Sequence, residues 1–152
     1  MDYFNPLDRP FWTVVGFAIL CGGLVGLERQ VRGKPAGVRT SILVCLGTSV
    51  FIHLGSALSG GAADPTRVLG QLVTGIGFLG AGVMLSREGT VTGVTTAAVI
   101  WVLAAIGACI GLERYLAALA LSGVTVAVLV GIELLESSVK WLALGVHRRD
   151  ED

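Results

Sequence analysis

The hydrophobic residues of this chain fall into five long blocks, separated by short polar segments. The blocks cover residues 11–27, 40–58, 68–85, 94–112 and 116–135. A helix needs about 20 apolar residues to cross a bilayer, where backbone polar groups must be satisfied internally. The pattern predicts an all-α integral membrane protein. Its one domain, 11–135, has five transmembrane helices and lies between a polar lead at 1–10 and a charged, amphipathic tail at 136–152.

The basic residues predict how these helices are oriented. The first loop carries the densest basic cluster, Arg29, Arg32, Lys34 and Arg39. If the N-terminus lies outside, eight of the eleven Lys and Arg residues face the cytoplasm, as the positive-inside bias requires. We therefore expect an extracytoplasmic lead and a cytoplasmic C-terminus. The first block lacks the basic region and cleavage site of a secretory signal, so it is expected to be a retained span.

Two helix–loop–helix units repeat at a constant offset of 56 residues. Residues 26–40 lie over residues 82–96 without gaps. The identical pairs are Gly26 and Gly82, Gly33 and Gly89, Gly37 and Gly93, Val38 and Val94, and Thr40 and Thr96. Because each unit contains two spans, both copies have the same orientation, as in parallel membrane repeats. The sequence predicts two parallel-repeated hairpins plus a fifth helix.

Glycines mark the expected helix-packing faces. They are Gly22 and Gly26 in the first span, and Gly75, Gly77, Gly80 and Gly82 in the third. Glycine lets two helix backbones approach closely in a membrane, either within one subunit or in a homodimer. Gly75, Gly77 and Gly80 also fit the G-x-G-x-x-G dinucleotide pattern, but that motif needs a preceding strand in a soluble βαβ unit, which this context excludes.

Composition narrows the functional class. The chain has 53% hydrophobic and 14% charged residues and no net charge, whereas soluble domains have roughly 25% charged residues. Nothing in this balance favours nucleic acid, and no catalytic triad, zinc spacing or phosphate-binding loop is present, so no enzyme activity is predicted. Cys21, Cys45 and Cys109 lie in apolar blocks without a CxxC pair and are expected to be core residues.

A polar cluster at the cytoplasmic end is the first candidate site. It combines Glu28, Arg29, Arg39 and Thr40 from the first unit with Arg87, Glu88, Thr95 and Thr96 from the second. Glu28 could hold a hydrated cation such as Mg²⁺, and the hydroxyls and helix N-termini could hold an anion. The alternative is that Glu28–Arg39 and Arg87–Glu88 are only loop salt bridges that fix the hairpins, because charges at a membrane boundary indicate function only weakly.

Three polar residues inside the spans form a second candidate set. His53, Gln71 and Thr74 could line a path or hydrogen-bond across a helix interface. A lone histidine on an apolar span is more often a packing residue. No Asp or Glu lies at the centre of any span, and this counts against a self-sufficient ion pump or channel.

Three ordered segments resemble the membrane domain of the MgtC/SapB family over roughly residues 15–135. They are GLERQVRGKPAGVRTSILVCLG, GQLVTGIGFLGAGVML and GVTTAAVIWVLAAIGACIG. The matching positions are Glu28, Arg29, Gly37, Arg39, Thr40, Gln71, Gly75, Gly77, Phe78, Gly80, Gly82, Gly93, Thr95, Thr96 and Trp101. The resemblance implies a bacterial inner-membrane protein linked to growth at low Mg²⁺ and, in some pathogens, to virulence.

The same resemblance leaves two functions open. Some family members are described as Mg²⁺ transporters, whereas others regulate membrane machines such as a transport ATPase or the ATP synthase. Virulence-associated members also carry a C-terminal ACT-like domain, which this sequence does not include before Asp152. We expect a magnesium-homeostasis protein that passes or senses the ion, or else a non-transporting regulator that binds another membrane protein. A homodimer surrounded by membrane lipids is expected in either case.

Overall fold

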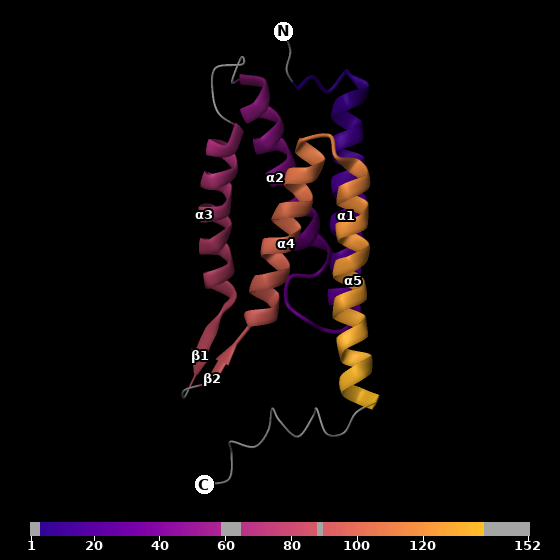
Figure 1. Ribbon diagram of the computed structural model, residues 1–152, viewed down its shortest axis with the longest axis vertical. Helices are drawn as coiled ribbons and strands as arrows, with labels where there is room; N and C mark the ends of the chain where they lie inside the picture. The colour runs from indigo at the N-terminus through magenta and orange to yellow at the C-terminus, as the bar shows by residue number, and fades with distance from the viewer. Residues whose placement is uncertain (1–3, 59–64, 88–89, 139–152) are drawn as a thin grey trace.

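The computed structural model describes residues 4–58, 65–87 and 90–138. Within these residues the chain forms five helices that run alternately up and down the molecule (Figure 1). Their bounds are α1 Arg9–Val31, α2 Val38–Leu58, α3 Pro65–Val83, α4 Val94–Gly111 and α5 Tyr115–Ser138. The predicted all-α fold is confirmed, and the start of α1 and the end of α5 lie at opposite ends of the bundle.

Four of the described helices are long and apolar enough to cross a membrane. The segments that qualify are Arg9–Val31, Val38–Ser56, Val94–Gly111 and Tyr115–Leu135. The third helix contributes a shorter apolar stretch, Arg67–Val83. This is a multi-pass membrane architecture, with α3 as its shortest apolar segment.

The first helix continues further than the sequence predicts. The first span was expected to end at Leu27, but α1 runs to Val31. It ends in a Schellman motif, in which Gly33 has φ of +65° and the Lys34 N–H donates to the Arg29 carbonyl at 2.9 Å. Glu28 and Arg29 therefore lie in the last helical turn rather than in the loop.

The connection between α3 and α4 also differs from the prediction. The third span was expected to reach Leu85, but α3 ends at Val83 and a small antiparallel sheet follows. Strand β1, Leu85–Arg87, pairs with β2, Thr90–Thr92, where a polar turn was predicted. The run Thr-Val-Thr consists of β-branched residues, which favour the extended conformation.

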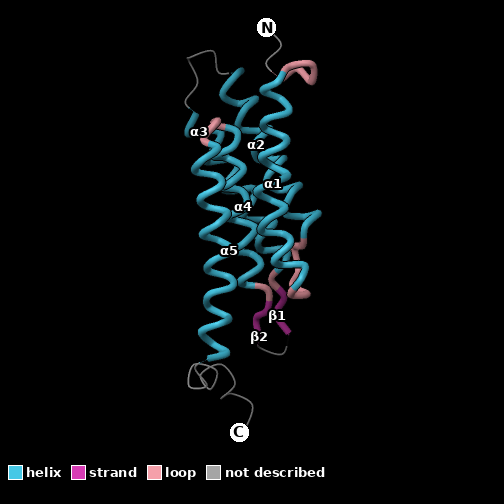
Figure 2. Tube along the Cα trace, turned by 90° about the vertical axis from the view of Figure 1, so that its right-hand side faces the viewer, coloured by secondary structure: helices cyan, strands magenta, loops and turns pink. Residues whose placement is uncertain are grey.

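The two predicted hairpin units are arranged alike. The loop after α1 and the β1–β2 hairpin both lie at the end of the bundle where α5 finishes (Figure 2). Val38 begins α2 and Val94 begins α4, each directly after the glycine of the repeated motif. The repeated sequence therefore corresponds to the same structural position, the start of the second helix of each hairpin.

Helix α2 is packed between two glycine pairs. A Cβ added to Gly22 would lie 2.8 Å from the Ile42 Cα, and one on Gly26 would lie 2.6 Å from the Val38 Cα. On α4, a Cβ added to Gly107 would lie 2.5 Å from the Cys45 carbonyl oxygen, and Gly111 is equally close to Ser49. Gly107 and Gly111 were not singled out from the sequence, although they have the same G-x-x-x-G spacing.

The glycines of α3 behave differently. A Cβ added to Gly75, Gly77 or Gly82 would meet nothing within 4 Å. Gly80 is buried and faces Ala97 of α4, but at an ordinary contact distance of 3.6 Å. Of these four glycines of α3, only Gly80 therefore contacts a neighbouring helix within the chain.

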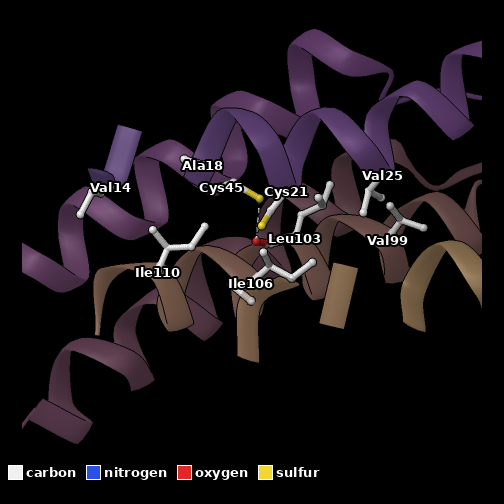
Figure 3. Close-up of a cluster of buried hydrophobic side chains, with 10 residues drawn as sticks. Val14, Ala18, Cys21, Val25, Cys45, Val99, Leu103, Ile106 and Ile110 are labelled. Atoms are coloured by element: carbon white, nitrogen blue, oxygen red, sulfur yellow. Dashed lines mark hydrogen bonds between the residues drawn. The ribbon is translucent and has the colours of Figure 1, made fainter. Parts of the chain in front are cut away.

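The apolar core lies where α1, α2 and α4 meet (Figure 3), and α5 contributes Ala118 to it. Its fully buried members are Val14, Ala18, Cys21, Val25, Cys45, Leu103, Ile106, Ile110 and Ala118. The Cys45 thiol donates to the Leu103 carbonyl at 3.3 Å. All three cysteines are free, and Cys21 and Cys45 are core residues as expected.

Candidate functional site

A cleft of about 750 Å³ opens at the end of the bundle that carries both hairpin loops. We call it the terminal cleft. Its charged side consists of Glu28, Arg29, Arg32, Lys34 and Glu133. The start of α4 forms a second side, and Val128, Leu129 and Ile132 of α5 form an apolar wall. The cleft therefore joins the end of α1, the start of α4 and the end of α5.

Arg29 connects the two hairpins inside this cleft. Its side chain is buried, with 4% exposure, and its Nη2 donates to the Thr96 Oγ1 at 2.8 Å. Its Nε is also buried and has no hydrogen-bond partner. Burying a donor without a hydrogen-bond partner costs roughly 1–3 kcal/mol. This Nε is one of two buried polar atoms at the cleft that have no hydrogen-bond partner.

The second buried atom without a hydrogen-bond partner belongs to Glu28. Its Oε1 accepts from the Arg32 Nε at 2.8 Å, and Arg32 also pairs with Glu133 of α5. The Glu28 side chain is 7% exposed, and its Oε2 is buried without a hydrogen-bond partner. Arg32 therefore partly neutralises two carboxylates and holds α1 against α5.

The backbone at the end of α1 positions Lys34 beside Arg29. Because Gly33 adopts a left-handed conformation, the chain reverses and the N–H groups of residues 33 and 34 cap the helix. Lys34 is exposed and lines the terminal cleft. Its ammonium group can therefore reach a ligand in the cleft while remaining in contact with water.

The start of α4 has no side-chain cap. The N-cap residue is Gly93, with φ of +88°, and a Cβ there would lie 2.2 Å from the Val83 carbonyl oxygen. Only glycine fits this tight exit from the β1–β2 hairpin. The first N–H groups of a helix have no partner within it, and here Val94, Thr95 and Thr96 line the cleft.

The structure brings part of the predicted polar cluster together. Glu28, Arg29, Thr95 and Thr96 share the terminal cleft, whereas Arg39 and Thr40 are exposed and are not among its lining residues. Glu28 pairs with Arg32 rather than with Arg39, which had been considered as its partner. Glu88 and the side chain of Arg87 lie outside the described residues.

Three charged cleft residues, Arg32, Lys34 and Glu133, were not among the predicted site residues. Residues four apart on one helix can form an ion pair. The pair of Glu28 and Arg32 could therefore be predicted from the sequence only if α1 was known to continue to Val31. Glu133 is more than 100 residues from Glu28 in the sequence, so only the packing of α5 reveals its role.

The predicted intramembrane polar residues do not form a common path. His53 lies near the far end of α2, half-buried, with its ring centroid 5.1 Å from that of Phe4. Thr74 donates to the Gly70 carbonyl of its own helix at 3.0 Å, and Gln71 is exposed. These side chains are therefore separate features rather than a second site.

Comparison with known proteins agrees with this architecture. The model of the MgtC family matches residues 15–138. This chain belongs to the MgtC family. The match covers the five helices apart from the first residues of α1, and it includes every described residue of the terminal cleft.

Several relatives are similar to this MgtC-family chain. Protein MgtC of Brucella abortus (strain 2308) is 48% identical over 108 residues, which cover 71% of this chain and 44% of that protein. "Putative magnesium transporter YhiD" of Escherichia coli K12 is 46% identical over 105 residues, 64% of this chain and 48% of that protein. An uncharacterized protein of Haemophilus influenzae is 34% identical over 97% of this chain and 63% of its own length.

This MgtC-family chain spans about half the length of the Brucella and E. coli relatives. No solved structure matches it significantly.

The chemistry available to the MgtC-family cleft follows from its side chains. Among the described residues, no three His, Cys, Asp or Glu side chains gather in a way that could hold a metal ion. Mg²⁺ usually keeps several waters and binds one or two carboxylates. Because Arg32 pairs with both Glu28 and Glu133, it would have to move away before the two carboxylates could share one hydrated cation. As it stands, the cleft has three cationic and two anionic side chains.

Proposed function

We propose that this chain acts in bacterial magnesium homeostasis as a regulator of another membrane protein, and that it does not conduct Mg²⁺ itself. Membership in the MgtC family and the name of the YhiD relative support the link to magnesium. A regulatory role is supported by the contrast between a charged cleft at one end and a closely packed core, in which the buried Ser49 and Ser122 hydroxyls donate to carbonyls of their own helices.

The main support for the absence of Mg²⁺ conduction is the close packing of the core. Val14, Cys21, Cys45 and Ile106 are fully buried where α1, α2 and α4 meet. A path for Mg²⁺ would need oxygen ligands or water along its length, because the ion loses its hydration shell reluctantly. The ion pairs among the described residues instead lie at the terminal cleft.

Helix α3 offers a surface for the partner. Phe78 is 80% exposed and Leu79 is 51% exposed, and Gly77 beside them has open space around it. On a different face of α3, an apolar groove of about 270 Å³ runs between α3 and α4, past Val73 and Trp101. Small and bulky residues together suit the close approach of another transmembrane helix, from a partner protein or a second copy of this chain.

Magnesium transport is the second candidate function. The observation in its favour is the Glu28 Oε2, a buried carboxylate oxygen without a partner at the terminal cleft. In this case Arg32 would release Glu28 and Glu133 when a hydrated cation enters. The positive-inside bias places the cleft on the cytoplasmic side of the inner membrane, and this orientation stays a prediction.

One experiment separates the two functions. The purified protein is reconstituted into liposomes containing a Mg²⁺-sensitive dye, and the same variants are tested for growth of a low-Mg²⁺-sensitive bacterial strain. A regulator should support growth without Mg²⁺ flux, and Gly77→Val should abolish growth at an unchanged protein level in the membrane. Flux that disappears in Glu28→Gln, with folding intact, would replace the regulator by a transporter.

A further inference from the structure

The charge in the terminal cleft is unevenly distributed. Arg32 pairs with both carboxylates, with the Glu28 Oε1 at 2.8 Å and with Glu133 of α5, while the buried Glu28 Oε2 has no hydrogen-bond partner. Arg29 gives its Nη2 hydrogen bond to the neutral Thr96 hydroxyl rather than to a carboxylate. With Lys34 also lining the cleft, three cationic side chains face two carboxylates there.

The start of α4 adds to this positive charge. An α-helix has a partial positive charge at its N-terminus, where free N–H groups can bind an anion. The 18-residue α4 begins in the cleft without a side-chain cap. Independently, the Arg29 Nε on the facing wall is buried and has no hydrogen-bond partner. Two sets of donors from different helices therefore line the same space.

The α5 side of the cleft is apolar, which indicates that the ligand also has an apolar part. Val128, Leu129 and Ile132 of α5 line the cleft with apolar surface. Arg29 is in the last turn of a helix long enough to cross the membrane, which is the depth of lipid headgroups. Basic pockets at this depth are suited to anionic headgroups, and neighbouring apolar surface is suited to an acyl chain.

We infer that the terminal cleft binds the phosphate group of an anionic ligand, with Arg29, Lys34 and the first turn of α4 as donors. The apolar α5 wall favours an anionic phospholipid over free phosphate as the source of that group. The physiological role of this ligand rests on the proposed function of the chain as a regulator. Binding itself can be measured without any growth assay.

The test uses the whole protein purified in mild detergent. Native mass spectrometry measures binding of phosphatidylglycerol, with phosphatidylcholine as the zwitterionic control lipid. Lys34→Gln should weaken phosphatidylglycerol binding about tenfold, and Arg29→Gln at least as much, since each removes a charge-assisted hydrogen bond. Arg39→Gln is the matched control, because it removes the same charge from an exposed residue outside the cleft.

A second arm identifies the source of the phosphate. Inorganic phosphate is added in a thermal-unfolding assay against chloride at equal ionic strength. Stabilisation of the wild type but not of Lys34→Gln, without preference for phosphatidylglycerol, would support the site with soluble phosphate as its ligand. Equal binding of both lipids by all variants, together with no phosphate effect, would overturn the inference.

The ligand and the regulator function can fail independently. If Arg29→Gln does not fold, the exposed Lys34→Gln decides whether the cleft binds phosphate. If the protein fails to support growth at low Mg²⁺ but still binds phosphatidylglycerol in the expected variant order, the regulator function is wrong and the ligand assignment stands. If growth is supported but lipid binding does not follow the variant order, the ligand assignment is wrong and the regulator function stands.

Discussion

The two repeated hairpins share a motif and an orientation but differ in how they pack. In the first, Gly22 and Gly26 bring α1 against the backbone of α2. In the second, Gly82 occupies the position equivalent to Gly26 and has nothing within 4 Å. Helix α4 instead packs on α2 through Gly107 and Gly111, so that α3 remains at the periphery.

This difference shows that a repeated sequence need not have a repeated role. Thr40 and Thr96 are equivalent by sequence, yet Thr40 is exposed whereas Thr96 is buried and accepts from Arg29. The position equivalent to Arg29 in the second unit is Leu85. The polar site therefore arises from unequal halves, with the arginine from one unit and the hydroxyl from the other.

The largest effect is expected at the glycine pair of the repeat. Gly26→Val should lower the free energy of unfolding by about 3 kcal/mol or more, because its side chain would overlap the α2 backbone. Gly82→Val should change it by less than about 0.5 kcal/mol. Thermal or denaturant unfolding in detergent measures both. Equal losses would mean that the two hairpins pack alike.

The glycines that precede the second helix of each hairpin give the next test. Gly93→Ala should lower the free energy of unfolding by about 2 kcal/mol. A residue other than glycine is strained in the left-handed conformation, and the new Cβ would meet the Val83 carbonyl oxygen. At Gly37, a Cβ would contact only the flexible Gln30 side chain at 3.1 Å or more, so Gly37→Ala should cost less than about 1 kcal/mol. Unfolding curves that rank the two variants in the reverse order would contradict this.

The two threonines of the repeat test the asymmetry of the polar site. Thr96→Val keeps the side-chain shape but removes the acceptor of Arg29, so a loss of about 1–2 kcal/mol in the free energy of unfolding is expected. Thr40→Val should be within about 0.5 kcal/mol of the wild type. The comparison fails if Thr40→Val is the more damaging variant in the same unfolding assay.

The smallest effect on stability is expected on the open face of α3. Gly77→Val should leave the free energy of unfolding within about 0.5 kcal/mol of the wild type, because its side chain enters open space. Cross-linking in native membranes should nevertheless show a weaker contact with a second copy or a partner. Unchanged cross-linking would mean that this face contacts lipid alone.

Much of the architecture could be predicted from the order of residues. Five apolar blocks define five helices, and a constant offset of 56 residues identifies two hairpins whose second helices begin after Gly37 and Gly93. These features depend on hydrophobicity and on local backbone preferences, which are properties of neighbouring residues. The free, buried Cys21 and Cys45 could be predicted on the same basis.

The contacts between helices were decided by the tertiary structure alone. Whether Gly26 or Gly82 touches a neighbour depends on how each helix is rotated and on what lies opposite. The link from Arg32 to Glu133 joins residues at the ends of α1 and α5, and Arg29 finds Thr96 in the other repeat. Such contacts cannot be read from periodicity, because every face of a membrane helix is apolar and many pairings bury it equally well.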